Sequence, residues 1–398
     1  MTRHRFSGVR RLLGLLLLSM SSCGHVAVAQ SSPEDNFFQA KECLEYGAYS
    51  NALSYFLEAA HHNHAKAQYN VAIMYRKGMG VTPSDAKALY WLKRAADNHN
   101  KRAAATHAKL LQHLTKEARH NKNAKAQTTL GIYHILLHGI QQNEEAYQWF
   151  SLATAQEDAP AKAHFYMAGY CFIKHRNRDA QLKHLKIAAE KGDAKAMEFY
   201  VLLSRHVGKA LDKQKEFEWI LKAAHQHNYS AMRAVARYYS QGSGGVSKNE
   251  QEANKWMQQA LACWIQNADL WDENALLELI VHLLENRDKK MARMYAQRLL
   301  HAASEHSDTL IDLLTRVGGS LPDDLYYAIA SKAAKSGYGT ALFYLATCYG
   351  EGRGVPKSHK KAVEYLTKAL NSPDMNMYPQ WKENIKIALK QIQETDPQ

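Results

Sequence analysis

Residues 65–96 read AKAQYNVAIMYRKGMGVTPSDAKALYWLKRAA, and this stretch decides the fold. Its first part repeats small and aromatic residues at the spacing of one helix face, at Ala67, Val71, Ala72 and Tyr75. Gly78 and Gly80 supply the positive φ angles that a tight reversal between two helices requires. Trp91 then lies four residues before the pair Ala95-Ala96, in a second helical pattern. We therefore expect two antiparallel helices, whose alanines allow close approach while an aromatic ring fills the remaining space.

The same unit returns about every 36 residues along the chain. Small-residue pairs near helix ends mark nine copies, and successive pairs are 36, 58, 35, 35, 37, 39, 34 and 36 residues apart. An aromatic residue lies four positions before seven of these nine pairs, and four of the seven are Trp91, Trp149, Trp219 and Trp256. The glycine turn returns at residues 242–246 and at Gly352-Arg353-Gly354-Val355. These repeats predict an all-α solenoid of about nine antiparallel helix pairs.

These residues carry a resemblance to a known repeat. Tyr75, Gly78 and Gly80, followed by Trp91 and the alanine pair, resemble the Sel-one-like repeat, a relative of the tetratricopeptide repeat. The copy from Tyr349 to Leu370 resembles it nearly as well, and the likeness extends over about residues 37–370. The resemblance implies a right-handed superhelix whose concave surface holds another protein. It also implies an adaptor role in bacterial envelopes, in host contact or in exopolysaccharide secretion.

Two segments interrupt the array. The 58-residue step contains a stretch at about 100–123 that reads as a long helix without a glycine turn. After Leu370, the segment Asn371-Ser372-Pro373 ends the repeats, and residues 378–393 form an amphipathic pattern. We predict a short linker at 30–36, a repeat array at 37–370 with a helical insertion, and a C-terminal capping helix and tail at 371–398.

The first 29 residues read as a secretory signal peptide. Four arginines without an acid precede the short apolar run LLGLLLLSM, which is too short for a stable membrane anchor. Ala27-Val28-Ala29 is a site for signal peptidase, whereas Met20-Ser21-Ser22-Cys23 is a loose lipobox that would make Cys23 a lipidated N-terminus. We expect an exported protein without a membrane span, either periplasmic or secreted, or else an outer-membrane lipoprotein.

The charge of the chain favours anionic partners without selecting one. The full chain has a net charge of +13, and removing four arginines with the signal leaves +9. This balance attracts anionic partners but does not select nucleic acid over anionic glycans or lipid headgroups, and an exported chain would seldom meet nucleic acid. Past the signal, the cysteines are Cys43, Cys171, Cys263 and Cys348, which are too widely spaced for a disulfide scaffold. At apolar helix positions, Cys171 and Cys348 are expected to be buried free thiols.

Signals for catalysis and for metal binding are weak. His134 and His138 are four residues apart, but no HExxH motif or cysteine pair accompanies them. The sequence also lacks a GxSxG motif, and no glycine turn continues into Gly-Lys-Ser/Thr. Some disulfide-rich relatives of the repeat are β-lactamase-like, but their cysteine pairs are missing here. We therefore expect no catalytic, cofactor or metal site, and no enzyme activity.

Two columns of residues on the first helix of the unit are candidates for a partner-binding surface. Lysine stands directly before the repeated alanine of this helix in four copies, at Lys66, Lys125, Lys162 and Lys195. Two residues after that alanine stand large rings or arginine, at Tyr69, Phe165, Arg233 and Phe343. Solvated lysines, and rings that pack against the next repeat, are the alternative interpretation. The sequence favours a protein-binding scaffold as the function. The second alternative is an adaptor for an anionic polysaccharide or peptidoglycan, and the third is a wall hydrolase or β-lactamase.

Overall fold

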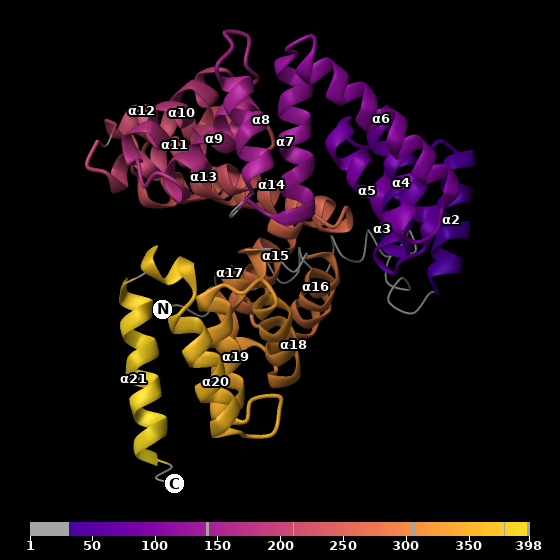
Figure 1. The fold of residues 1–398 in the computed structure, drawn as a ribbon. Helices are drawn as coiled ribbons and strands as arrows, with labels where there is room; N and C mark the ends of the chain where they lie inside the picture. Colours follow the sequence, from indigo (N-terminus) through magenta and orange to yellow (C-terminus); the bar gives the residue numbers. More distant parts are fainter. Residues whose placement is uncertain (1–31, 141–142, 210, 304–307, 378, 396–398) are drawn as a thin grey trace. The chain divides into compact units, whose positions relative to one another are not determined.

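The computed structural model describes residues 32–140, 143–209, 211–303, 308–377 and 379–395, and over these residues all regular structure is helical (Figure 1). The predicted signal peptide, which includes Cys23, lies outside the described residues. Consecutive helices pack as pairs along the described chain. The prediction of an all-α solenoid built from helix pairs is therefore confirmed.

Each pair consists of an A helix followed by a B helix. The A helices are α2 (Pro33–Glu45), α4 (Ala65–Lys77), α7 (Ala124–His138), α9 (Ala161–Ile173), α11 (Ala194–His206), α13 (Tyr229–Gln241), α15 (Glu273–Glu285), α17 (Asp308–Val317) and α19 (Gly339–Glu351). The B helices are α3 (Tyr49–His61), α5 (Asp85–Asp97), α8 (Glu144–Thr154), α10 (Arg178–Glu190), α12 (Lys213–His225), α14 (Glu250–Asp269), α16 (Lys289–Ala302), α18 (Asp323–Ala334) and α20 (His359–Leu370). Two further helices, α6 (Lys101–Arg119) and α21 (Pro379–Thr395), stand outside the pairs.

The chain divides within α6 into two compact units, Met1–Lys109 and Leu110–Gln398. The first unit contains α2 to α5, and the second contains α7 to α21. The division falls in the 19-residue helix that occupies the long step of the sequence period. This helix is an addition between the B helix α5 and the next A helix α7.

Small polar side chains begin most of the helices. In these helices, the side chain of the residue before the helix accepts a hydrogen bond from the backbone N–H three positions later, which satisfies one of the free amides of the first turn. Asn123, Asp193 and Asn228 cap the A helices α7, α11 and α13 in this way. His64 caps α4 through Nδ1, 3.0 Å from the amide of Ala67, and its Nε2 lies 2.9 Å from Glu34. The histidines of the His61–His64 loop therefore include a helix cap.

Alanines and rings form the core, as the repeat pattern predicts. Ala67 and Tyr75 are buried in α4, and Trp91 is buried in α5. Three tryptophans at the same position of other B helices are half-buried and contact neighbouring side chains: Arg119 lies over Trp149, Lys222 over Trp219, and His225 against Trp256. These rings therefore contribute to packing both within and between repeats.

The glycine turns end three A helices. Gly78, Gly242 and Gly352 are the C-cap residues of α4, α13 and α19, and all three have left-handed backbone angles. Glycine adopts this conformation without the steric penalty of a Cβ atom. The second glycines, Gly80 and Gly354, also have positive φ angles of 71° and 70°. The turn thus fixes the reversal between the two helices of a repeat.

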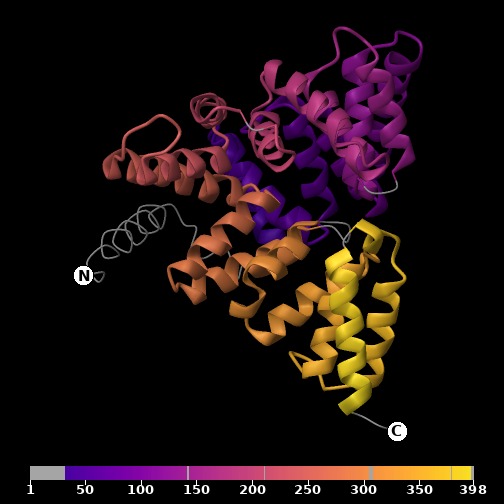
Figure 2. The same ribbon diagram turned by 90° about the vertical axis from the view of Figure 1, so that its left-hand side faces the viewer.

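The first helix begins before the predicted start of the repeat array. Residues 33–36, expected as linker, belong to α2, because Ser32 and Asp35 form a capping box and Pro33 occupies the first helical position. At the other end, α21 lies alongside α20 (Figure 2). Phe343, Trp381 and Ile385 belong to the apolar cluster that joins α21 to α19 and α20.

Candidate functional site

The lysine column of the sequence lies on the surface. Each of its members is the second residue of an A helix, and each is exposed: Lys66 on α4, Lys125 on α7, Lys162 on α9 and Lys195 on α11. A cation at this position faces the positive end of the helix dipole, so it does not stabilise its own helix. Lys125, Lys162 and Lys195 all lie in the second unit, at equivalent positions of successive A helices.

All four members of the ring and arginine column are half-buried, and each contacts a neighbouring side chain. Tyr69 lies beneath the guanidinium of Arg102, 5.2 Å from its ring centre. Phe343 packs against the ring of Trp381 on α21, with centroids 5.3 Å apart. Both residues therefore contact other parts of their own unit.

Phe165 contacts one member of a pair of exposed apolar side chains in the second unit. Its ring lies edge-on to Phe199 of α11, with centroids 5.7 Å apart. Phe199 is 49% exposed, and Leu202, three residues later on the same helix face, is 47% exposed. Large apolar side chains that adjoin one another at the surface are typical of a contact site for another molecule. The sequence analysis missed Phe199 and Leu202, although both lie within the helix that it recognised.

Arg233 belongs to an ion network across three A helices. Its guanidinium lies 2.6 Å from Glu278 of α15. Arg316 of α17 approaches both oxygens of the same carboxylate, at 2.8 and 3.2 Å. Glu278 is 9% exposed, so these two cations compensate a buried charge. Arg233 therefore joins successive repeats.

A neighbouring acid extends the polar surface to α11. Glu198 accepts a hydrogen bond from the Asn228 side chain at 3.3 Å. Burial raises the pKa of Glu198, while Asn228 and Arg233 act in the opposite direction. We use the term α11–α13 face for Lys195, Phe199, Leu202 and Arg205 of α11 together with Arg233 and Arg237 of α13.

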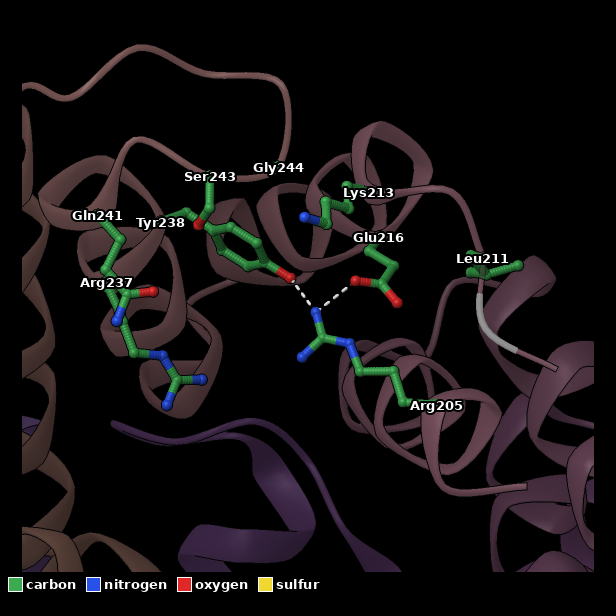
Figure 3. A pocket seen from close by; sticks show the side chains of 9 residues that line it. All are labelled: Arg205, Leu211, Lys213, Glu216, Arg237, Tyr238, Gln241, Ser243 and Gly244. Atoms are coloured by element: carbon green, nitrogen blue, oxygen red, sulfur yellow. Dashed lines mark hydrogen bonds and ion pairs between the residues drawn. The ribbon is translucent and has the colours of Figure 1, made fainter. Parts of the chain in front are cut away.

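A cleft of about 520 Å³ adjoins this face between α11, α12 and α13. Figure 3 shows the Arg205 guanidinium between the Tyr238 hydroxyl and the Glu216 carboxylate, and it donates a hydrogen bond to each. The hydrogen bond to Glu216 raises the pKa of Arg205 further above its ordinary value. Lys213 and Arg237 also line the cleft. Three cations and one buried carboxylate thus surround it.

Buried glutamines form a second feature that the sequence analysis missed. The Gln68 amide donates to the carbonyl of Ala60 at 2.9 Å and accepts from Asn98 at 2.8 Å. Gln127 makes the equivalent pair of bonds, to the carbonyl of Ala118 and from Gln156. Each glutamine satisfies a carbonyl at the end of the preceding helix. The recurring letters AKAQ were the available signal.

Among the described residues, no three His, Cys, Asp or Glu side chains are arranged to hold a metal ion. His134 lies 2.7 Å from Glu145. Cys171 and Cys348 are buried free thiols, as predicted. Within the same residues, none of the helices has the length and apolar character needed to cross a membrane.

Four of the helix pairs coincide with matches to a known repeat family. The family profile for the Sel1 repeat matches residues 65–100, 124–158, 230–263 and 339–374. The chain contains Sel1 repeats. The matched Sel1 repeats correspond to the pairs α4–α5, α7–α8, α13–α14 and α19–α20. The resemblance to the Sel-one-like repeat is thereby confirmed, and the structure adds helix pairs between the matched Sel1 repeats.

Solved structures with similar helix arrangements include two repeat proteins. One is c5321, a protective antigen of uropathogenic Escherichia coli with an SLR fold, at 20% identity over 87% of this chain and 77% of that chain, with a TM-score of 0.36. The other is a Sel1 repeat protein from Oxalobacter formigenes, at 23% identity over 56% of this chain and 98% of that chain, with a TM-score of 0.34. No curated protein matches the chain significantly.

Proposed function

We propose that this Sel1-repeat chain is a non-catalytic scaffold, exported from a bacterial cell, that binds a protein partner through the α11–α13 face. The observation that carries the proposal is the exposure of Phe199 and Leu202, at 49% and 47%, beside Phe165. Large apolar side chains that remain in water lower the free energy when a partner covers them, by about 1.5–3 kcal/mol for each side chain buried fully.

The face is held in place before any partner arrives. Arg205 is fixed by Glu216 and Tyr238, and Arg233 by Glu278. A pre-formed surface loses little conformational entropy on binding, which favours affinity. Solenoids use their side-by-side helices in this way as extended binding surfaces.

Site-specific photocross-linking tests this proposal. A photoreactive amino acid is placed at Phe199 or Leu202 in cells, with Lys290 of α16 as an exposed control position in the same unit. We expect a discrete protein adduct from positions 199 and 202 that is absent from position 290. Equal adducts at all three positions, or none at 199 and 202, would contradict a binding site on this face.

Export needs a separate test. Fractionation of cells followed by mass spectrometry of the N-terminus would detect either Gln30 or a lipidated Cys23 as the first residue. Cys23→Ala removes lipidation and leaves the site after Ala29 intact. An unprocessed chain in the cytoplasm would contradict export.

A second candidate is an adaptor for an anionic polysaccharide or peptidoglycan. The observation that favours it is the exposed lysine series Lys125, Lys162 and Lys195 in one unit. Binding through exposed cations would weaken steeply with salt, because charges are screened over about 8–10 Å at physiological ionic strength. Replacing Lys125 and Lys162, which lie outside the α11–α13 face, by glutamine should weaken polymer binding strongly, whereas partner capture through Phe199 should persist.

A further inference from the structure

The cations of the cleft beside α11 lie at one end of the exposed apolar pair Phe199 and Leu202. We infer that the α11–α13 face binds an acidic peptide segment, whose large apolar side chain covers Phe199 and Leu202 and whose carboxylate enters the cleft at Arg205 and Arg237. This inference rests on the proposed function and names the chemistry of the partner.

The apolar group and the cleft are continuous along one helix. Phe199, Leu202 and Arg205 follow one another at intervals of three residues, and all three are exposed on α11. Residues at this spacing lie on one helix face. Arg205 also lines the cleft, so a peptide that covers Leu202 reaches the cleft within one helical turn, about 5.4 Å.

The charges around the cleft do not cancel. Glu216 is only 4% exposed and is already paired with Arg205. In the part of the chain that the structure describes, neither Lys213 nor Arg237 has an acidic partner within ion-pair distance, and both are exposed. Arg205 uses one nitrogen for its two bonds, and a guanidinium carries five N–H donors. The cleft therefore offers an excess of cationic donors to an incoming carboxylate.

The combination selects a peptide over other anions. Inorganic phosphate or a sulfated sugar would satisfy the cations but would leave Phe199 and Leu202 in water. A neutral apolar peptide would cover these two side chains but would bury part of the Arg237 charge without compensation, which is unfavourable. An acidic residue close to a large apolar residue satisfies both parts of the surface.

Selection from a random peptide library displayed on phage tests the inference. The processed chain is the target, and peptides that survive washing are synthesised for measurement of their affinities by fluorescence anisotropy. We expect enrichment of Asp or Glu close to Phe, Leu, Ile or Trp. Replacement of these acids by their amides should weaken binding about tenfold or more.

Matched variants of the target locate the contact. Arg237→Glu should weaken binding about tenfold or more, whereas Lys290→Glu, which changes the net charge equally on α16, should leave the affinity within about twofold. Circular dichroism and the unfolding midpoint verify that each variant folds. Arg237→Gln provides a milder substitution if Arg237→Glu fails to fold.

Three results would overturn the inference, and they differ in meaning. Peptides without enriched acids, or peptides that bind Arg237→Glu as tightly as the parent chain, would reject the acidic partner while protein binding through Phe199 stands. Binding of alginate with the same dependence on Arg237, without selected peptides, would favour the polymer adaptor. Peptides that bind Phe199→Asp unchanged would reject both the inference and the proposed binding face.

Discussion

Gly354 lies against the backbone carbonyl of Asp323, so closely that a Cβ atom on Gly354 would be 2.2 Å from that oxygen. Asp323 is the first residue of α18, the B helix of the preceding repeat. Gly80 stands in the same relation to Tyr49, the first residue of α3, where a Cβ would lie 2.6 Å from the carbonyl carbon. In both cases the glycine follows its contact by 31 residues. The second glycine of the turn therefore sets the distance between repeats.

The two glycines of the last turn should differ in their tolerance of a side chain. Gly354→Ala should lower the free energy of unfolding by about 2–4 kcal/mol, because it adds a collision to a φ of +70°. Gly352→Ala should cost about 1 kcal/mol, since its Cβ would lie 3.4 Å from Lys357, an ordinary contact. Urea unfolding followed by circular dichroism measures both. Equal losses would show that backbone angle alone decides the cost.

The Arg205–Glu216 ion pair should contribute strongly to the stability of the second unit. Arg205→Met leaves Glu216, whose side chain is 6% exposed, without its cation, and should lower stability by about 3 kcal/mol. The double variant Arg205→Met with Glu216→Met should recover most of this loss, because no unpaired charge stays buried. Tyr238→Phe removes only one hydrogen bond and should cost about 1 kcal/mol. A double variant as unstable as Arg205→Met alone would contradict this explanation.

The histidine pair of α9 and α10 should make stability depend on pH. The Nδ1 atoms of His164 and His184 lie 2.9 Å apart, and burial, followed by repulsion from His184 and Lys191, lowers the pKa of His164 to about 4. Between pH 6.5 and 4 the unfolded chain therefore binds more protons than the folded chain. The free energy of unfolding should be highest above pH 6.5 and should decrease by about 1 kcal/mol as the pH falls to 4.

A single substitution isolates this effect. His164 occupies the position that Gln68 and Gln127 occupy in other A helices, so His164→Gln restores a residue that the repeat already accommodates. Glutamine does not titrate in this range. Unfolding midpoints at several pH values should therefore change less steeply in His164→Gln than in the parent chain, and an unchanged slope would place the pH dependence elsewhere.

The helix pairs could be predicted from the sequence because their determinants are local. The spacing of Ala67, Ala72 and Tyr75 specifies a buried helix face, and Gly78 specifies the end of that helix. The same pattern recurs along the chain, so the prediction made from one copy is strengthened by the other copies. The same reasoning located the long helix α6, where the glycine turn is missing.

The binding face could not be predicted in the same way, because exposure depends on distant neighbours. Phe165 and Phe343 occupy the same column of the repeat, yet Phe343 is covered by Trp381 of α21, whereas Phe165 leads to the exposed Phe199. Arg233 is joined to Glu278, 45 residues away. A single sequence shows which residues share a position in the repeat, but it does not show which of them a later helix will cover.

The buried thiols should react more slowly in the folded protein than in denaturant. Burial raises the pKa of the Cys348 thiol to about 12 and raises the pKa of the Cys171 thiol as well. Because the thiolate is the reactive form, both residues should react slowly with Ellman's reagent in the folded protein and fully in denaturant. A missing thiol in denaturant would indicate a disulfide and would revive the hydrolase or β-lactamase alternative.

The buried glutamine of α4 should stabilise the first unit through the carbonyl that it satisfies. Gln68 is fully buried, donates to the Ala60 carbonyl at the end of α3, and accepts from Asn98 at the end of α5, so it links three helices. Gln68→Met keeps a similar volume but leaves both groups without this partner, which should lower stability by about 1–3 kcal/mol. The exposed Gln112→Met of α6 is a matched control, and we expect it to change stability by less than about 0.5 kcal/mol. Hydrogen exchange distinguishes a local from a global effect: protection should fall first in α3 to α5, and a uniform loss over both units would contradict a local role for Gln68.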